Sequence, residues 1–466
     1  MAVNHVQVPS LSLLPREKTK IFVMNKYESE REIIRQQWET TPYPELPLET
    51  SPKNDANSLY LHNLVTPFYL RNHLVLETQG KLILDVGCGT GYTSLTLAEA
   101  NPGAKIIGID MSEKSLDLAR QRSRYHGFEN SEFYALAAEE LPSLNLQFDY
   151  INCDEVLYLL PDPVVGLKAM QAVLKPDGII RANLHSSLQR EFYFRAQKVF
   201  AMMGLMDEAP NELEVKLLRE VMRSLKQDTY LRMIAWKPDF ETDDQGVRVN
   251  FLMQGDKGFT VKELFAALEA ANLEFVSMIN WRYWELMDLF QDPENLPAFL
   301  AMSLPEVPLE ERLHLFELLH PVHRLLDFWC AHPNQTQDYV PVSEWSTEDW
   351  QEAQVRLHPQ LTTPQAREKL IDCINSRRPF EISQLISLPA RTPITVDSHI
   401  AACLLPLWEG PQSFMSLVER WQIVQPINAI TLEPVNVQTA FEEIQKLLSS
   451  LEVYLYVLLE LPQSQT

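Results

Sequence analysis

The chain has 466 residues, a formal net charge of −23 at pH 7 and 45% hydrophobic residues. This length exceeds what one hydrophobic core normally serves, so we expect two or three domains. The acidic excess argues against a nucleic-acid partner, because such binding depends on Lys and Arg contacts to phosphates. Acidity suits a cytoplasmic protein, or one that attracts a basic partner.

The five cysteines are scattered and form no CxxC pair. This pattern predicts reduced thiols in the cytoplasm, with neither a disulfide framework nor a metal site. We expect no signal peptide and no membrane partner, since the start lacks a basic stretch followed by an apolar one and no run of about 18 apolar residues occurs. The stretch VYLYVLLEL at 453–461 is short and contains Glu460, so we expect a core helix.

The N-terminal part predicts little regular structure. Residues 1–24 resemble an irregular lead-in, and 25–41 predict a helix. The stretch TPYPELPLETSP at 41–52 contains four prolines and cannot be regular. Residues 57–77 predict a further helix.

From residue 81, short apolar strands alternate with helices. This alternation predicts an α/β fold with a doubly wound, Rossmann-like parallel sheet and right-handed crossovers. Ser112 is a suitable N-cap for one helix, and Lys175–Gly178 predicts a turn. The expected strands are 81–86, 104–109, 131–136, 148–153 and 179–184, and the expected helices are 92–99, 112–125 and 163–174.

After residue 185 the alternation stops, and 187–235 predicts mostly helix. A helix at 259–271, capped by Thr260, and a strand at 273–279 then resume the α/β domain. Residues 281–330 predict an aromatic-rich helical region. The expected domains are an N-terminal helical lid (1–76), the α/β domain (77–285) with a helical insertion at about 186–258, a helical connector (286–340) and a mainly helical C-terminal domain (341–466).

The stretch DVGCGTG at 85–91 places three glycines directly after the first strand. Glycine lets the backbone approach a ligand and adopt positive φ. Ligands of such sheets bind at the carboxyl ends of the strands, where the strand order reverses. A dinucleotide fingerprint would need a third glycine at Tyr92, and the absence of a following GKS or GKT excludes a P-loop.

Asp110 closes the strand IIGID, nineteen residues after Gly91. A carboxylate there can accept hydrogen bonds from two ribose hydroxyls. The alternative role for Asp110 is to cap the helix that begins near Ser112. Asp85 either orders the glycine turn and reaches the bound ligand, or is a satisfied buried carboxylate.

The segments DVGCGTG, IIGID and FDYINCDEVLYLLPDPVVGLKAMQAVLKPDGII follow one another within about 105 residues. Together they resemble the successive motifs of class I methyltransferases that depend on S-adenosylmethionine (SAM). The resemblance implies SAM as cofactor and S-adenosylhomocysteine as product. It assigns cofactor binding to Asp85, Gly87, Cys88, Gly89, Gly91, Asp110, Met111, Ala138, Glu139 and Asp154, although Cys88 also suits the role of a small filler in the turn.

Many members of that family carry an Asp that accepts from the adenine amine. The matching segment here is AAEELP, and Ala137 occupies the position of the Asp. The adenine contact therefore does not carry over. Either the Ala138 backbone or Glu139 substitutes for it, or Glu139 is a solvated charge at a helix start.

Because the SAM sulfonium already activates the methyl group, the enzyme mainly aligns a nucleophile and excludes water. We expect the acceptor pocket to form from residues after the fourth and fifth strands and from the lid. Each candidate also has a structural interpretation, as a helix cap, a packed ring or a hydrogen-bonded histidine. The expected catalytic residues are Tyr43, Glu155, Tyr158 and His185, the last suited to a general base, and the other candidates are Trp38, Asp154 and Asn183.

A second resemblance spans most of the chain. WETTPYPELPL at 38–48 is similar to the YDxxPYxSxPF signature of bacterial protein-lysine methyltransferases and of methyltransferases with a so-called regulatory domain. Trp38 stands where that family has Tyr, while Pro42 and Tyr43 match. ANLHSSLQREFYFRA stands where the family has YNTYPGW, and only Asn183 matches well.

Two later segments extend this resemblance. RLLDFWC at 324–330 is similar to the YLDFLRNR helix of that family, and LLPLWEGPQSFMSLVERW at 404–421 to its LLPLLDGTRDRxxL segment. The resemblance implies a protein lysine or peptide as methyl acceptor. Two alternatives stay open: a methyltransferase of a small metabolite, with 186–258 covering the pocket, and a SAM-binding regulatory protein without an acceptor.

Overall fold

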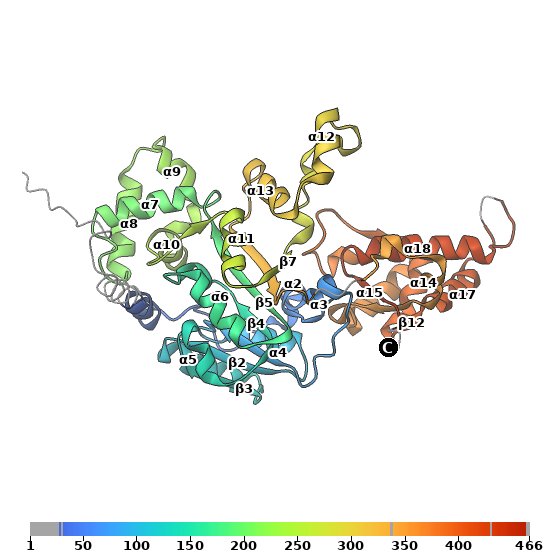
Figure 1. Cartoon of the computed structure of the whole chain (residues 1–466), viewed down its shortest axis with the longest axis horizontal. Helices are drawn as coiled ribbons and strands as arrows, with labels where there is room; N and C mark the ends of the chain where they lie inside the picture. Colours follow the sequence, from blue (N-terminus) through green and yellow to red (C-terminus); the bar gives the residue numbers. More distant parts are fainter. Residues whose placement is uncertain (1–27, 29–30, 336–338, 429–430, 463–466) are drawn as a thin grey trace, which may run out of the picture.

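The computed structural model describes residue 28 and residues 31–335, 339–428 and 431–462. The expected lead-in at 1–24 lies outside these residues, and 31–40 of the expected helix at 25–41 is helical. Figure 1 shows a central sheet domain, a helical insertion at one end and a C-terminal domain at the other.

The central sheet has the strand order β3-β2-β1-β4-β5-β8-β7, with β6 paired to β5. The first five strands of that order are parallel, and β8 is antiparallel to both β5 and β7. This confirms the doubly wound parallel sheet, whose order reverses between β1 and β4. The strands are β1 (Leu82–Val86), β2 (Lys105–Asp110), β3 (Ser131–Ala135), β4 (Phe148–Cys153), β5 (Leu174–Ser186), β6 (Gly258–Phe259), β7 (Glu274–Met278) and β8 (Leu325–Ala331).

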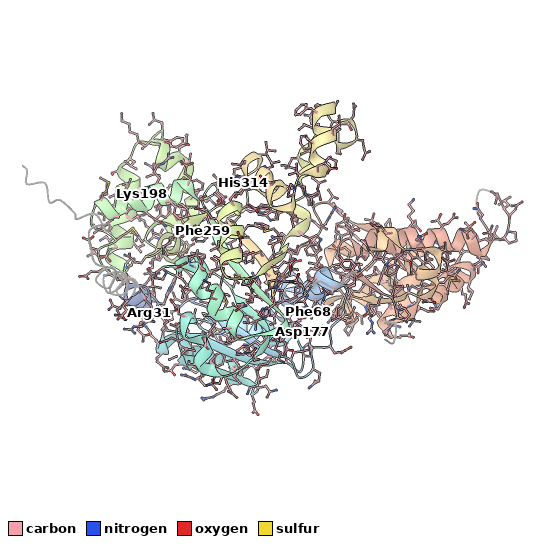
Figure 2. All side chains as sticks on the ribbon, viewed as in Figure 1. Arg31, Phe68, Asp177, Lys198, Phe259 and His314 are labelled. Atoms are coloured by element: carbon pink, nitrogen blue, oxygen red, sulfur yellow. The ribbon has the colours of Figure 1, made fainter. Side chains whose placement is uncertain are left out.

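Helices cover both faces of the sheet, which is why its central strands are buried apolar runs. On one face α6 (Pro163–Ala172) and α11 (Val261–Ala270) bury Leu167 and Leu264 against the strands. On the other face α4 (Tyr92–Ala100) and α3 (Val65–Asn72) contribute Leu97 and Phe68, the latter labelled in Figure 2. The sheet edge at β2 and β3 is packed by α5 (Glu113–Tyr125).

The local signals near the sheet are largely confirmed. Ser112 caps α5 by accepting from the Ser115 amide at 3.1 Å, and Thr260 caps α11. The expected turn at Lys175–Gly178 lies inside β5, where the pairing moves from Phe148–Leu174 to Tyr150–Ile179. Those four residues therefore lie opposite the single residue Asp149 and form a bulge within one long strand.

Two expected helices are wrong. Residues 325–330 form most of β8, and the end of the stretch at 453–461 forms β13 (Val457–Glu460), paired with β9 (Gln354–Leu357). Short apolar runs suit a buried strand as well as a buried helix, so periodicity could not separate the two. β8 lies between β5 and β7, and the sheet therefore continues beyond the expected connector boundary at 285.

The expected helix at 57–77 is two helices, α2 (Ala56–His62) and α3. Leu64 and Phe68 pack against the sheet, whereas Tyr60 and Tyr69 pack in the core of the C-terminal region. This pair of helices therefore joins the two parts. That region contains α14 (Thr347–Glu352), α15 (Pro364–Asn375), α16 (Ser398–Ala401), α17 (Phe414–Val424), α18 (Val437–Glu452), a sheet of order β12-β9-β13 with β12 at Gln412–Ser413, and the pair β10 (Phe380–Glu381) and β11 (Thr395–Val396).

The insertion forms its own small core around Phe200 and Phe251. Its helices are α7 (Glu191–Met202), α8 (Glu212–Ser224), α9 (Tyr230–Ala235) and α10 (Asp244–Phe251), and the later helices α12 (Ala298–Ser303) and α13 (Leu309–Leu319) lie between β7 and β8 in the chain. Within the described ranges, no helix has the length and apolar character that crossing a membrane requires.

Candidate active site

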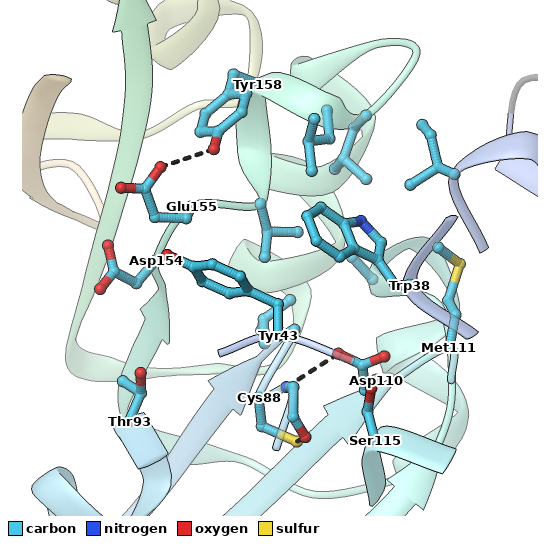
Figure 3. A pocket seen from close by; sticks show the side chains of 18 of the residues that line it. Trp38, Tyr43, Cys88, Thr93, Asp110, Met111, Ser115, Asp154, Glu155 and Tyr158 are labelled. Carbon is cyan, nitrogen blue, oxygen red and sulfur yellow. Dashed lines mark hydrogen bonds between the residues drawn. The ribbon is translucent and has the colours of Figure 1, made fainter. Parts of the chain in front are cut away.

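A cavity of about 540 Å³ is lined by residues at the carboxyl ends of β1, β2, β4 and β5. The wall also includes the loop at 154–161, α10 of the insertion, Arg324 just before β8 and residues 31–46 of the lid, which is the segment 31–48. Figure 3 shows labelled side chains of the lid, of the loop at 154–161 and of the ends of the strands around one space. The cavity lies at the switch point of the sheet, where the sequence predicts a ligand.

The glycine turn adopts the backbone that only glycine tolerates well. Gly87, Gly89 and Gly91 have φ of 70°, 51° and 80°. Gly87 and Gly89 line the cavity, whereas Gly91 begins α4, where an added Cβ would lie 2.8 Å from the Ala119 Cα. The first two glycines therefore present bare backbone, and the third permits helix packing.

Asp110 lines the cavity beside the turn, and the backbone holds its carboxylate. One oxygen accepts from the Gly89 amide at 3.0 Å and the other from the Ser112 amide at 2.8 Å. Burial raises the pKa of Asp110. A carboxylate offers about four acceptor positions, so Asp110 can still accept from a ribose hydroxyl.

Next to Asp110, the cavity wall is apolar and suits an aromatic base. Met111, Leu136 and Ala138 line it, with Glu139 beside them. Ala137 starts the 3₁₀ helix at Ala138–Leu144, and its backbone amide donates to Glu140. These features fit SAM: the glycine turn presents bare backbone, the carboxylate can bind the ribose, and the apolar wall can contact the adenine.

Asp85 does not line the cavity and is 1% exposed. Its two oxygens accept from the Ser94 hydroxyl at 2.6 Å and the Asn152 amide at 2.9 Å. Burial raises the pKa of Asp85 to about 6. The geometry favours the satisfied buried carboxylate, which ties β1 to α4 and β4 beneath the turn.

Cys88 borders the cavity but is buried in a cluster with Leu116, Ala119 and Phe133. Burial raises the pKa of its thiol well above the ordinary value. These surroundings suit a small packed side chain, the filler role considered for it.

The opposite end of the cavity brings together Tyr43, Asp154, Glu155 and Tyr158. The Tyr158 hydroxyl donates to Glu155 at 2.7 Å. Glu155 has a φ of 59°, and its amide donates to the Asn183 side chain at 2.9 Å. Held in this conformation, Glu155 also forms an ion pair with Arg324.

His185 is 1% exposed and borders this end, with its ring stacked on Tyr158 at 3.7 Å between centroids. Its Nδ1 lies 2.6 Å from Asp256, and its Nε2 lies 3.0 Å from an Arg324 nitrogen. Since arginine only donates, Nε2 must accept and Nδ1 must carry the proton. His185 is therefore neutral with its lone pair engaged, and burial lowers its pKa. This arrangement favours a hydrogen-bonded supporting residue over a general base.

Asp154 is held by partners deeper in the sheet. It accepts from the Asn183 amide at 2.5 Å and pairs with Arg181 at 3.3 Å. Burial alone would raise the pKa of Asp154, but the charge of Arg181 and the hydrogen bond from Asn183 outweigh it and leave the pKa lowered. Arg181 also pairs with Asp327 at 2.8 Å.

Sequence reasoning missed Arg324, Asp327, Arg181 and Asp256 as supports of the site. The available signal was RLLDFWC, which contains Arg324 and Asp327 but was interpreted as a helix. Asp256, from the end of the insertion, had no comparable signal, because its pairing with His185 spans 71 residues.

Tyr43 and Trp38 enter the cavity from the lid. Their ring centroids lie 5.8 Å apart, and Figure 3 shows the Tyr43 ring directed toward Asp154. The Tyr43 carbonyl accepts from the Thr90 amide at 3.0 Å, so the lid rests on the glycine turn. Burial raises the pKa of the Tyr43 hydroxyl. This arrangement is that of an α/β domain whose cavity, at the carboxyl ends of its strands, suits a nucleoside-type cofactor.

Comparisons with known proteins agree with this class. A family model described as a methyltransferase domain matches residues 77–237. An uncharacterized protein from Synechococcus sp. is 27% identical over 272 residues, covering 57% of this chain and 63% of its own length. A ubiquinone biosynthesis O-methyltransferase from Bordetella avium is 38% identical over 120 residues, covering 25% of this chain and 47% of its own length.

One solved structure matches along most of the chain. PKMT2 from Rickettsia typhi, in complex with AdoHcy, has a TM-score of 0.57 and 18% identity, covering 89% of this chain and 76% of that chain. The curated relatives are matched over only about half to two thirds of their length. Residues 77–237 therefore form a methyltransferase domain of the class I SAM-dependent type, and SAM is the cofactor of that family.

Proposed function

We propose that the protein transfers the methyl group of SAM to the side-chain amine of a lysine in a protein or peptide. The observation that carries this proposal is the meeting of Tyr43, Asp154 and Glu155 at the end of the cavity opposite the donor cradle. Carboxylates attract a lysine ammonium group and orient it by hydrogen bonds. After the ammonium has lost one proton to solvent, the amine nitrogen forms the new N–CH3 bond as the S–CH3 bond of SAM breaks and S-adenosylhomocysteine leaves. The aromatic rings of Trp38 and Tyr43 add a favourable surface for a cation.

The wall beyond this end suits the methylene stem of a lysine. Ile34, Leu159, Val249 and Met253 line it. Apolar side chains around the stem would exclude water from the amine as it approaches the methyl group. The Tyr43 hydroxyl and the Glu155 carboxylate would orient the nitrogen, while Arg324 and Tyr158 hold Glu155 in place.

One comparison and one property of the sequence support a macromolecular acceptor. The fold of PKMT2 matches nearly the whole chain, including the regions outside the methyltransferase domain. The net charge of −23 also favours encounter with a lysine-rich partner.

A small-molecule acceptor is the second candidate. Val249, Asn250 and Met253 bring the insertion onto the cavity wall, and such a cover suits a compact substrate. The O-methyltransferase from Bordetella avium gives this candidate a relative, although it matches only 25% of the chain.

Labelling distinguishes these functions. The purified protein is incubated with tritiated SAM and a soluble lysate, which is then separated into protein and small-molecule fractions. We expect the label in the protein fraction, released as methyl-lysine on acid hydrolysis. Glu155→Gln should lower it at least about tenfold, whereas the exposed control Glu129→Gln should not.

Label in the small-molecule fraction alone would replace the first proposal by the second. If neither fraction is labelled although SAM binds at micromolar affinity, the protein is a SAM-binding regulator.

A further inference from the structure

Arg122, on α5, is a buried arginine with unusual partners. Its side chain donates from Nε to the Thr90 carbonyl at 3.0 Å and from its two terminal nitrogens to the Pro47 and Leu46 carbonyls, each at 2.8 Å. The residue is 1% exposed and forms no ion pair within the described part of the chain. Buried arginines are usually paired with a carboxylate, so the burial of this one needs a reason.

The three carbonyls belong to two separate segments that meet at the cavity. Thr90 stands between Gly89 and Gly91 in the glycine turn, and Leu46 and Pro47 belong to the lid. Thr90 itself makes two bonds to the lid, from its amide to the Tyr43 carbonyl at 3.0 Å and from its hydroxyl to the Pro44 carbonyl at 2.8 Å. Arg122 thus closes a ring of hydrogen bonds around the junction of turn and lid.

This junction sets the position of groups at both ends of the cavity. An added Cβ on Gly89 would lie 2.2 Å from the Tyr43 carbonyl oxygen, so lid and turn are already in close contact. Tyr43 lines the acceptor end, and Gly89 lines the donor cradle. A shift of the lid would therefore disturb the cradle and the acceptor end together.

We propose that Arg122 is a positioning residue for methyl transfer. It fixes residues 43–48 of the lid on the glycine turn. Its planar fork reaches three carbonyls in two segments at once, which a lysine ammonium at the end of a flexible stem matches poorly. The role concerns the SAM cradle and the lid. It holds for either class of acceptor, so failure of the proposed lysine activity leaves it intact.

The test compares Arg122→Met with Arg124→Met, an exposed arginine on the same helix. Calorimetry measures the dissociation constant of SAM, and hydrogen exchange by mass spectrometry measures the amides of 41–50. We expect Arg122→Met to weaken SAM binding at least about tenfold, or about 1.4 kcal/mol. Exchange in 41–50 should rise in step, and Arg124→Met should change neither.

Two further variants keep the test decisive if Arg122→Met folds poorly. Arg122→Lys should restore part of the SAM affinity, and Thr90→Val, which removes only the hydroxyl bond to Pro44, should weaken SAM binding two- to fivefold. Wild-type affinity in Arg122→Lys and Thr90→Val together would overturn the proposal. The proposal would also be overturned if Arg122→Met showed faster amide exchange in 41–50 but bound SAM within twofold of the wild-type affinity. Arg122 would then only stabilise the chain.

Discussion

Replacing Gly89 by alanine tests whether the glycine turn and the lid form one site. Gly89 has a φ of 51°, and the added Cβ would lie 2.2 Å from the Tyr43 carbonyl oxygen. Contacts under 3.0 Å are essentially never seen for a Cβ, and this neighbour is backbone that cannot rotate away. The lid must therefore shift by at least about 0.8 Å.

The magnitude has two parts. A residue with a Cβ in the left-handed region costs about 1–2 kcal/mol of folding stability. The shift of the lid also lengthens the bond from the Thr90 amide to the Tyr43 carbonyl, now 3.0 Å, which is worth about 1 kcal/mol. Because a misplacement of about 1 Å can cost about 100-fold in rate, we expect SAM affinity to fall at least tenfold and methyl transfer about 100-fold.

Gly127→Ala is the matched control. Gly127 has a φ of 76°, and nothing lies within 4 Å of its added Cβ. It carries the same backbone strain without the clash. Thermal unfolding should show a loss of stability about 1 kcal/mol larger in Gly89→Ala than in Gly127→Ala. Calorimetry should show a loss of SAM affinity only in Gly89→Ala.

Equal SAM affinity in the two variants would refute the reasoning, because strain alone would then account for the effect. The two variants would also bind SAM equally well if the lid did not contact the glycine turn when SAM is bound. Unfolding of Gly89→Ala but not of Gly127→Ala would show that the contact with Tyr43 supports the whole domain.

Three further predictions concern single residues. Asp110→Ala should lower SAM affinity at least about 100-fold by calorimetry, since it removes the proposed carboxylate partner of two ribose hydroxyls, while circular dichroism stays unchanged. Burial raises the pKa of Asp85 to about 6, above the ordinary 3.8, so the folded state keeps a proton that the unfolded chain has lost between these values. The free energy of unfolding of the wild type should therefore fall as the pH rises through this window, whereas that of Asp85→Asn should not. Urea unfolding should show the difference between the two changing by up to about 3 kcal/mol in favour of Asp85→Asn from pH 3.5 to pH 7. Parallel curves of stability against pH would contradict this. Trp329→Ala should cost about 3–5 kcal/mol in urea unfolding, because this fully buried ring on β8 donates to the Tyr150 hydroxyl at 3.0 Å; a cost below about 1 kcal/mol would place β8 outside the cooperative sheet.

The part of the fold that sequence predicted well is the run from β1 to β5. Its strands and helices alternate within short distances, and each carries its own signal, such as the N-cap Ser112. The glycine turn and Asp110 were predictable for the same reason, since a strand followed by a bare turn is a local pattern. The local pattern alone therefore predicts that the glycine turn and Asp110 lie at the end of the cavity proposed to bind SAM.

Side chains at the acceptor end were named correctly as neighbours, but their chemistry depended on distant partners. Tyr43, Glu155 and Tyr158 do line one cavity. His185 was expected as a general base, yet the geometry at Asp256 and Arg324 engages both ring nitrogens. Such contacts span 71 and 139 residues, and no local pattern encodes them.

The sequence by itself determined the glycine turn and the carboxylate of Asp110, which we propose to hold the methyl donor, because backbone conformation and a strand-end carboxylate are properties of short segments. Only the tertiary structure decided the rest of the site. In the tertiary structure, residues 325–330 belong to a strand between β5 and β7. This placement brings Arg324 next to Glu155 and Asp327 next to Arg181. The physical reason is that an apolar run suits either a helix or a strand, and the choice between them is made by the partners against which it packs.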